Sequence, residues 1–135
     1  AQVQDLMTAN PFVVEPETSL YDAYTLLFEK EIRRLPVVRG KTLVGIVTLS
    51  DIQRVLPSAF TETDTDAQLQ VMTLTVSDVM TPEPVTVTPE DTIQEVAEAM
   101  LENQVSALPV VQNERLIGII TESDIFKFIV SSWSE

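Results

Sequence analysis

Two short segments carry side chains that could hold a sugar and an anion. These side chains are Thr48, Ser50 and Asp51 in one segment and Thr121, Ser123 and Asp124 in the other. Each segment is expected to join a strand to a helix start, where hydroxyls and backbone N–H groups favour an anionic group. Each carboxylate can also accept two hydrogen bonds from vicinal sugar hydroxyls. The alternative is that these side chains only cap a helix and complement its dipole.

Each of the two segments lies at the end of one copy of an internal repeat. LPVVRGKTLVGIVTLSDI, residues 35–52, returns as LPVVQNERLIGIITESDI, residues 108–125. The upstream residues match at the same offset without a gap: Asp5, Met7, Thr8, Pro11, Val14, Pro16 and Glu17 reappear as Asp78, Met80, Thr81, Pro84, Val87, Pro89 and Glu90. Because such units seldom bury an apolar face alone, we expect the copies to pack as one body with pseudo-two-fold symmetry.

The local patterns predict an α/β fold in which each copy runs strand, helix, strand, strand, helix. In the first copy we expect strands at 12–14, 35–38 and 43–48, a helix from Thr18 or Ser19 to 31, and a helix opened by Ser50 and Asp51. The apolar stripe of the first helix is Leu20, Ala23, Tyr24, Leu27 and Phe28. In the second copy we expect strands at 85–87, 108–111 and 116–121, and helices at 92–103 and from 123 onward. Thr92 and Glu95 are expected to form a capping box.

These patterns divide the chain into a first repeat at 1–57, a connector at 58–76 and a second repeat at 77–135. Within the connector, residues 67–74 could form a short helix that docks through Leu69, Val71 and Met72. Trp133, near the end of the second repeat, is expected to be exposed. The plain interpretation of Trp133 is a frayed end, and the alternative is a dimer contact.

Composition limits the function. The chain has 135 residues, is 44% hydrophobic, contains neither cysteine nor histidine and has a formal net charge of −13. The missing residue types remove disulfides, thiolate chemistry and the commonest metal ligand and general base. The negative charge repels nucleic acid and anionic membranes, so neither partner is expected. With no apolar run long enough to span a bilayer and no signal pattern, we expect a cytoplasmic protein.

The basic residues are clustered in the sequence. Five of the eight, Lys30, Arg33, Arg34, Arg39 and Lys41, fall between positions 30 and 41. One interpretation is a local cationic spot that binds an anion. The other is that Lys30, Arg33 and Arg34 complement the carbonyls at the end of the preceding helix.

Each copy resembles a cystathionine β-synthase (CBS) domain, and the whole resembles a tandem CBS pair, or Bateman module. The resemblance rests on MTxxPxxVxPE, on LPVV and on the terminal GIVTLSD and GIITESD, each present in order in both copies. The family implies a regulatory module without catalysis. It binds AMP, ADP, ATP or S-adenosylmethionine in clefts between repeats, and it commonly forms a homodimer.

By the same resemblance, each pocket combines residues of both repeats. The first would use Ile46, Thr48, Ser50 and Asp51, with Arg33 and Arg34 near the phosphates and Val85, Val105 and Ser106 around the base. The second would use Ile119, Thr121, Ser123 and Asp124, with Phe12, Ile32 and Arg33. The plainer interpretation of Ile46 and Ile119 is that they belong to the core. Because Ser106-Ala107 replaces Arg33-Arg34 in the second copy, phosphate-bearing ligands should prefer the Asp51 pocket.

We therefore expect an allosteric sensor that needs no cofactor or metal and passes ligand occupancy to a protein effector. One alternative is a ligand-free scaffold for dimerisation or protein interaction. A second is an enzyme that pairs carboxylates around a divalent cation. The enzyme reading is disfavoured because the motif carboxylates fall in separate pockets and no H-E-x-x-H or P-loop pattern occurs.

Overall fold

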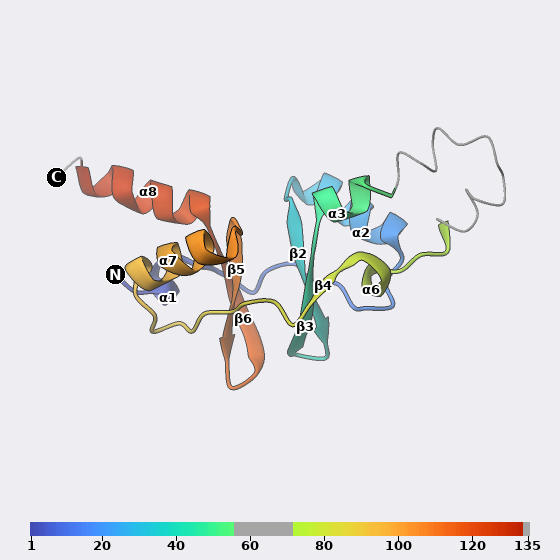
Figure 1. The fold of residues 1–135 in the computed structure, drawn as a ribbon, viewed down its shortest axis with the longest axis horizontal. Helices are drawn as coiled ribbons and strands as arrows, with labels where there is room; N and C mark the ends of the chain where they lie inside the picture. The colour runs from blue at the N-terminus through green and yellow to red at the C-terminus, as the bar shows by residue number, and fades with distance from the viewer. Residues whose placement is uncertain (56–71, 134–135) are drawn as a thin grey trace. The chain divides into compact units, whose positions relative to one another are not determined.

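Two antiparallel hairpins dominate the fold, one in each of two compact units. The structure, a computed structural model, describes residues 1–55 and 72–133 (Figure 1). One unit is the continuous stretch Phe12–Glu83, called the central unit below. The other combines Ala1–Pro11 with Pro84–Glu135 and is called the split unit.

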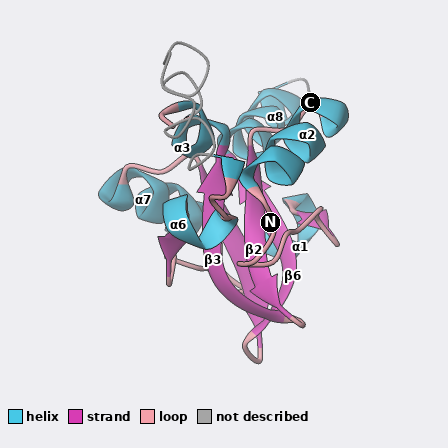
Figure 2. Ribbon diagram, turned by 90° about the vertical axis from the view of Figure 1, so that its right-hand side faces the viewer, coloured by secondary structure: helices cyan, strands magenta, loops and turns pink. Residues whose placement is uncertain are grey.

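The central unit is built on β2 (Arg34–Arg39) and β3 (Thr42–Thr48), joined by a turn at Gly40 with φ of 66°. The short β4 (Thr81–Pro82) also pairs with β3 in the antiparallel direction. The helices are α2 (Leu20–Lys30), α3 (Leu49–Gln53) and α6 (Val76–Val79). Figure 2 shows α3 continuing directly from the end of β3, which places the Thr48–Asp51 segment at the strand–helix junction.

Helix α2 confirms the predicted apolar stripe with one exception. Ser19 caps the helix by accepting a hydrogen bond from the amide of Asp22. Leu20, Ala23 and Leu27 are buried in the core of the central unit, and Tyr24 packs against it. Phe28 is 76% exposed, so its assignment to this stripe was wrong. Its position one residue after Leu27 turns it away from the buried face.

The split unit repeats this arrangement. β5 (Ala107–Gln112) pairs with β6 (Arg115–Thr121), and the short β1 (Thr8–Ala9) pairs with β6. The helices are α1 (Val3–Leu6), α7 (Ile93–Asn103) and α8 (Glu122–Trp133). The expected capping box of α7 is present, with Thr92 and Glu95 each accepting a hydrogen bond from the other's amide.

The opening segment of each repeat packs with the remainder of the other repeat. The amide of Val3 donates to the carbonyl of Asp91 at 3.0 Å in the split unit. Val76 matches Val3 in the repeat, although the boundaries predicted from the sequence place it at the end of the connector; its amide donates to the carbonyl of Thr18 at 2.8 Å in the central unit. Both valine side chains are fully buried in their unit's core. Each core therefore requires a segment that belongs, by sequence, to the other copy.

One glycine in each hairpin makes room for a methionine side chain. A Cβ atom added to Gly45 would lie 2.6 Å from Sδ of Met80, and one added to Gly118 would lie 2.6 Å from Sδ of Met7. Met80 precedes β4 and Met7 precedes β1, so each methionine crosses a hairpin strand where that strand carries no side chain. The methionine and glycine that recur in both sequence motifs thus form one packing contact per unit.

Other expectations need correction. The predicted strands at 12–14 and 85–87 reduce to isolated parallel bridges, Val14 with Val37 and Val87 with Val110. The run from Leu43 to Thr48 is only partly buried, because Gly45 and Val47 are buried while its other residues are half-buried. Met72 is 71% exposed and does not dock, whereas Leu69 and Val71 lie outside the described residues. Trp133 is 75% exposed, as expected.

Candidate functional site

Thr48 and Asp51 form a reciprocal cap at the start of α3. The amide of Thr48 donates to Oδ2 of Asp51 at 2.9 Å, and the amide of Asp51 donates to Oγ1 of Thr48 at 3.1 Å. The sequence predicted that Ser50 and Asp51 open this helix, but the N-cap is Thr48. Thr48 has extended backbone angles and is the last residue of β3, so it can accept from the helix while still belonging to the strand.

This cap leaves fewer free N–H groups than predicted for anion binding. The amide of Leu49, the first helical residue, donates to the carbonyl of Arg33 at 2.7 Å. With the amide of Asp51 also engaged, two of the first three helical N–H groups are bonded within the protein. Fewer backbone N–H groups are therefore open at this helix start than the sequence predicted.

In the second repeat, Thr121 and Asp124 form the same pair of capping residues at the start of α8. The amide and the hydroxyl of Thr121 donate to Oδ2 of Asp124 at 2.9 and 3.1 Å. The amide of Asp124 approaches Oγ1 of Thr121 at 3.3 Å, and the amide of Glu122 donates to the carbonyl of Ser106 at 2.9 Å. In both repeats the cap is made through Oδ2, so Oδ1 of each aspartate is outside the cap.

Arg33 and Arg34 lie beside the Thr48–Asp51 group within the central unit. The bond from Leu49 to the carbonyl of Arg33 fixes that residue next to the helix start. Arg34 is the cross-strand partner of Thr48 in the β2–β3 register. At the matching places the split unit has Ser106 and Ala107, and Ala107 pairs with Thr121. The Asp51 group thus has two arginine residues next to it in its unit, where the Asp124 group has a serine and an alanine.

The remaining basic residues of the predicted cationic spot lie elsewhere. Lys30 places Nζ 5.0 Å from the ring centroid of Phe12, a cation–π contact at the end of α2. Arg39, at the far end of β2 from Arg34, donates to Glu17 at 2.9 Å, and Lys41 follows in the turn. Since a strand rises about 3.3 Å per residue, Arg39 and Arg34 are too far apart to hold one small anion.

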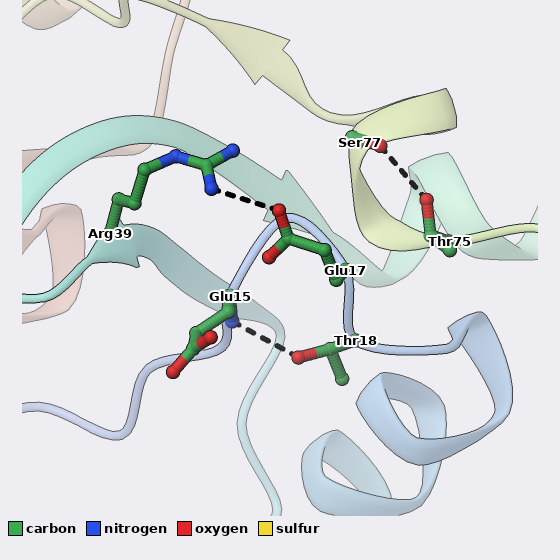
Figure 3. A network of polar contacts seen from close by, with 6 residues as sticks. All are labelled: Glu15, Glu17, Thr18, Arg39, Thr75 and Ser77. Carbon is green, nitrogen blue, oxygen red and sulfur yellow. Dashed lines mark hydrogen bonds and ion pairs between the residues drawn. The ribbon is translucent and has the colours of Figure 1, made fainter.

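Figure 3 shows the contacts around Glu17. Arg39 reaches Glu17, and the amide of Glu15 donates to Oγ1 of Thr18 at 3.1 Å. A hydrogen bond from the backbone and the bond from Arg39 lower the pKa of Glu17 below its ordinary value of 4.5. This network stabilises the loop before α2 and takes Arg39 away from the candidate site.

The other predicted site residues differ in exposure. Ile46 and Ile32 are half-buried, and Ile32 packs against the core of the central unit. Ile119 is buried, which agrees with the plainer interpretation of its side chain as core. Phe12, Val85 and Val105 are apolar but exposed by 50%, 43% and 37%. Ser50, Ser106 and Ser123 are also exposed.

Sequence reasoning missed two features of the central unit. Arg54 places Nη1 3.5 Å from Oδ1 of Asp51, a contact that its position three residues later could have signalled. A groove of about 600 Å³ lies beside α2, lined among others by Glu15, Tyr21, Asp22 and Glu29. None of the predicted site residues lines it. Within residues 1–55 and 72–133, the acidic side chains form no group able to hold a metal ion.

A family comparison matches both repeats. The CBS domain model matches residues 3–58 and again residues 76–131. The chain belongs to the CBS domain family. The tandem pair and the mixed α/β fold expected from the motifs are thereby confirmed.

Solved CBS pairs have the same fold. CBSX2, known from Arabidopsis thaliana and solved in complex with AMP, is 33% identical, with a TM-score of 0.82 over 96% of both chains. The CBS domain pair of protein MJ0100, solved with methylthioadenosine and S-adenosylmethionine, is 26% identical, with a TM-score of 0.82 over 98% of both chains.

Curated relatives are longer proteins. An inosine-5'-monophosphate dehydrogenase from Korarchaeum cryptofilum is 38% identical over 125 residues, which cover 92% of this chain and 22% of the enzyme. The chain spans less than half the length of the curated relatives it matches first. In the part of the chain that the structure describes, no helix combines the length and apolar character needed to cross a bilayer.

Proposed function

We propose that this CBS pair is a regulatory module that binds an adenosyl ligand, AMP, ADP, ATP or S-adenosylmethionine, through its two Thr–Asp groups. The observation that carries the proposal is that each helix cap uses Oδ2 of its aspartate. Oδ1 of Asp124 and Oδ1 of Asp51, which contacts the exposed side chain of Arg54, are outside the caps and can accept from a ligand. A carboxylate oxygen held in this way is a pre-oriented acceptor for ribose hydroxyls. The ligands of the CBSX2 and MJ0100 structures belong to the same chemical class.

The proposal assigns phosphate-bearing ligands to the Asp51 group. Arg33 and Arg34 lie beside that group, whereas Ser106 and Ala107 occupy the matching places near Asp124. The planar guanidinium matches phosphate oxygens better than a serine hydroxyl does. S-adenosylmethionine, whose sulfonium is positive, is better suited to the Asp124 group. Binding then regulates a partner protein only through a difference in affinity between two states of the module.

Titration calorimetry with AMP, ADP, ATP and S-adenosylmethionine tests the proposal, with GTP as the purine control. We expect saturable heat and a raised melting temperature with at least one adenosyl ligand and weaker effects with GTP. Asp51→Asn should weaken AMP binding more than Asp124→Asn does. Neither heat nor a melting shift at millimolar concentrations of any adenosyl ligand would sink the proposal.

A second candidate function, assembly of two copies, is favoured by the surface of α8. Phe126, Ile129, Val130 and Trp133 are exposed by 67%, 39%, 46% and 75%, and their spacing places them on one helix face. The first repeat has Gln53 where the second has Phe126. An exposed apolar stripe on a helix is typical of a contact surface.

Sedimentation velocity, with and without AMP, tests the assembly. The double variant Phe126→Ser with Trp133→Ser should shift a dimer to monomer, while Lys127→Gln, on the same helix but off the stripe, should not. A module that serves only as a scaffold would dimerise to the same extent with and without ligand. A single monomeric species of the unmodified chain at high concentration would contradict this second function.

A further inference from the structure

The carboxylate oxygen of Asp51 that is not used by the helix cap forms an ion pair with Arg54. Oδ2 of Asp51 accepts from Thr48, and Oδ1 lies 3.5 Å from Nη1 of Arg54. The side chain of Asp51 is only 13% exposed, whereas that of Arg54 is 75% exposed. The carboxylate is therefore fixed by its surroundings, and the arginine is the member of the pair that can move away.

The second repeat lacks this arrangement. Lys127 occupies the position that matches Arg54, three residues after Asp124. Among the described residues, the ion pairs found involve Asp51 and Glu17 but not Asp124. A lysine ammonium is also a strongly hydrated point charge, less suited than a guanidinium to a carboxylate or phosphate. The two candidate carboxylates thus differ in whether a cation already occupies Oδ1.

Resting on the function proposed above, we propose that Arg54 is a specificity-determining residue that makes the Asp51 group select nucleotides over uncharged nucleosides. Ribose hydroxyls that bind Oδ1 must displace Arg54. With adenosine, the displaced guanidinium returns to water and the ion pair is lost. With AMP, the guanidinium gains a new partner, because the phosphate lies within the screening length of about 8 Å from the same ribose.

The expected effect is modest, because exposed ion pairs contribute little. Pairs of this kind change equilibrium constants by about two- to fivefold. Removing Arg54 should strengthen adenosine binding, since Oδ1 becomes vacant, and should weaken AMP binding, since a phosphate partner is lost. The opposite signs make the ratio of the two dissociation constants more informative than either constant.

The test is calorimetric titration of the full chain with adenosine and with AMP, in an Asp124→Asn background that weakens the second group. Asparagine keeps an oxygen acceptor for the α8 cap, so folding is preserved. In this background, Arg54→Gln should lower the preference for AMP over adenosine by about two- to fivefold. Arg54→Lys should restore part of the preference, and the matched control Lys127→Gln should leave it unchanged.

The outcomes separate this inference from the proposed function. An unchanged preference in Arg54→Gln, with both ligands still bound, would overturn the role of Arg54 and leave the adenosyl site intact. An equal loss in Lys127→Gln would also overturn it, because a general charge effect would then suffice. If neither ligand binds the unmodified chain, the proposed function fails, and the role of Arg54 fails with it.

Discussion

The amides of Thr48 and Asp51 each donate to the other residue's side chain, at 2.9 and 3.1 Å. The same two residues that the sequence suggested for ligand binding therefore also hold the start of α3. The two interpretations that the sequence left open, helix cap and ligand group, do not exclude each other, because the cap uses Oδ2 and leaves Oδ1. Substitutions that keep the cap can then measure the ligand role separately.

Asp51→Asn and Asp51→Ala should separate these roles. Alanine removes the cap and should lower the free energy of unfolding by about 1 kcal/mol, while asparagine keeps an acceptor and should cost less. Both should weaken AMP binding by roughly tenfold, because a charged acceptor for ribose is lost. Thermal melting and calorimetry measure the two effects. Unchanged AMP affinity in Asp51→Asn would assign the carboxylate to capping alone.

Fragments should follow the units of the structure rather than the repeats of the sequence. Residues 12–83 contain the whole central unit, including Val76, and should unfold cooperatively. Residues 1–57 lack Val76 and carry Val3 without the core in which it is buried, so they should not fold. Circular dichroism during heating measures both fragments.

Substitutions within the fragment 12–83 test whether the burial of Val76 is the reason that this fragment folds. Val76→Ala in residues 12–83 should lower the free energy of unfolding by ~2 kcal/mol, because the valine is fully buried there. The exposed neighbour Ser77→Ala should change it little. A stable fold in residues 1–57 would show that the exchanged segment is dispensable.

Replacing Glu31 by glycine should stabilise the protein. Glu31 follows α2 with φ of 56° and ψ of 42°, a left-handed conformation that costs a non-glycine residue energy. After the larger unfolded-state entropy of glycine is subtracted, the gain should be about 0.5 kcal/mol. Urea unfolding measures it. Glu29→Gly, an exposed position inside α2, should instead destabilise by about 1 kcal/mol.

The pH dependence of Glu17 should depend on Arg39. Since the pKa of Glu17 is lowered in the folded state, its contribution to stability is present above pH 4.5 and is lost as the pH falls through the lowered value. Arg39→Gln should raise the pKa of Glu17 toward 4.5, though not fully, because the backbone hydrogen bond remains. NMR titration of the side-chain carboxyl measures this. Lys41→Gln is the charge-matched control and should cause a smaller shift.

The sequence predicted the elements that depend on local chemistry. Ser19 and Thr92 cap α2 and α7 as expected, because a hydroxyl before an apolar stripe is a local signal. The helix start at Thr48 was misplaced by two residues because Thr48, Ser50 and Asp51 are all good caps. The choice depends on the end of β3, which pairing with β2 determines.

Contacts between residues that are far apart in the sequence could not be predicted from local patterns. Both repeats read as continuous stretches, so nothing local indicated that Val3 and Val76 are buried with the other copy's residues. The basic residues at positions 30–41 are close in sequence. Arg34 and Arg39 nevertheless lie at opposite ends of β2 and are therefore far apart in the structure. The contact of Arg54 with Asp51 is different, because a spacing of three residues on a helix is a local signal that could have predicted it.

The exchange of opening segments has a consequence for synthesis on the ribosome. The central unit is complete in sequence once residue 83 has emerged, so it can assemble while translation continues. Residues 1–11, in contrast, belong to the unit whose second hairpin and helices are made later. During that interval Val3 and Met7 are available to chaperones or to a neighbouring nascent copy. Residues 1–11 are thus made before the central unit but reach their native place after it.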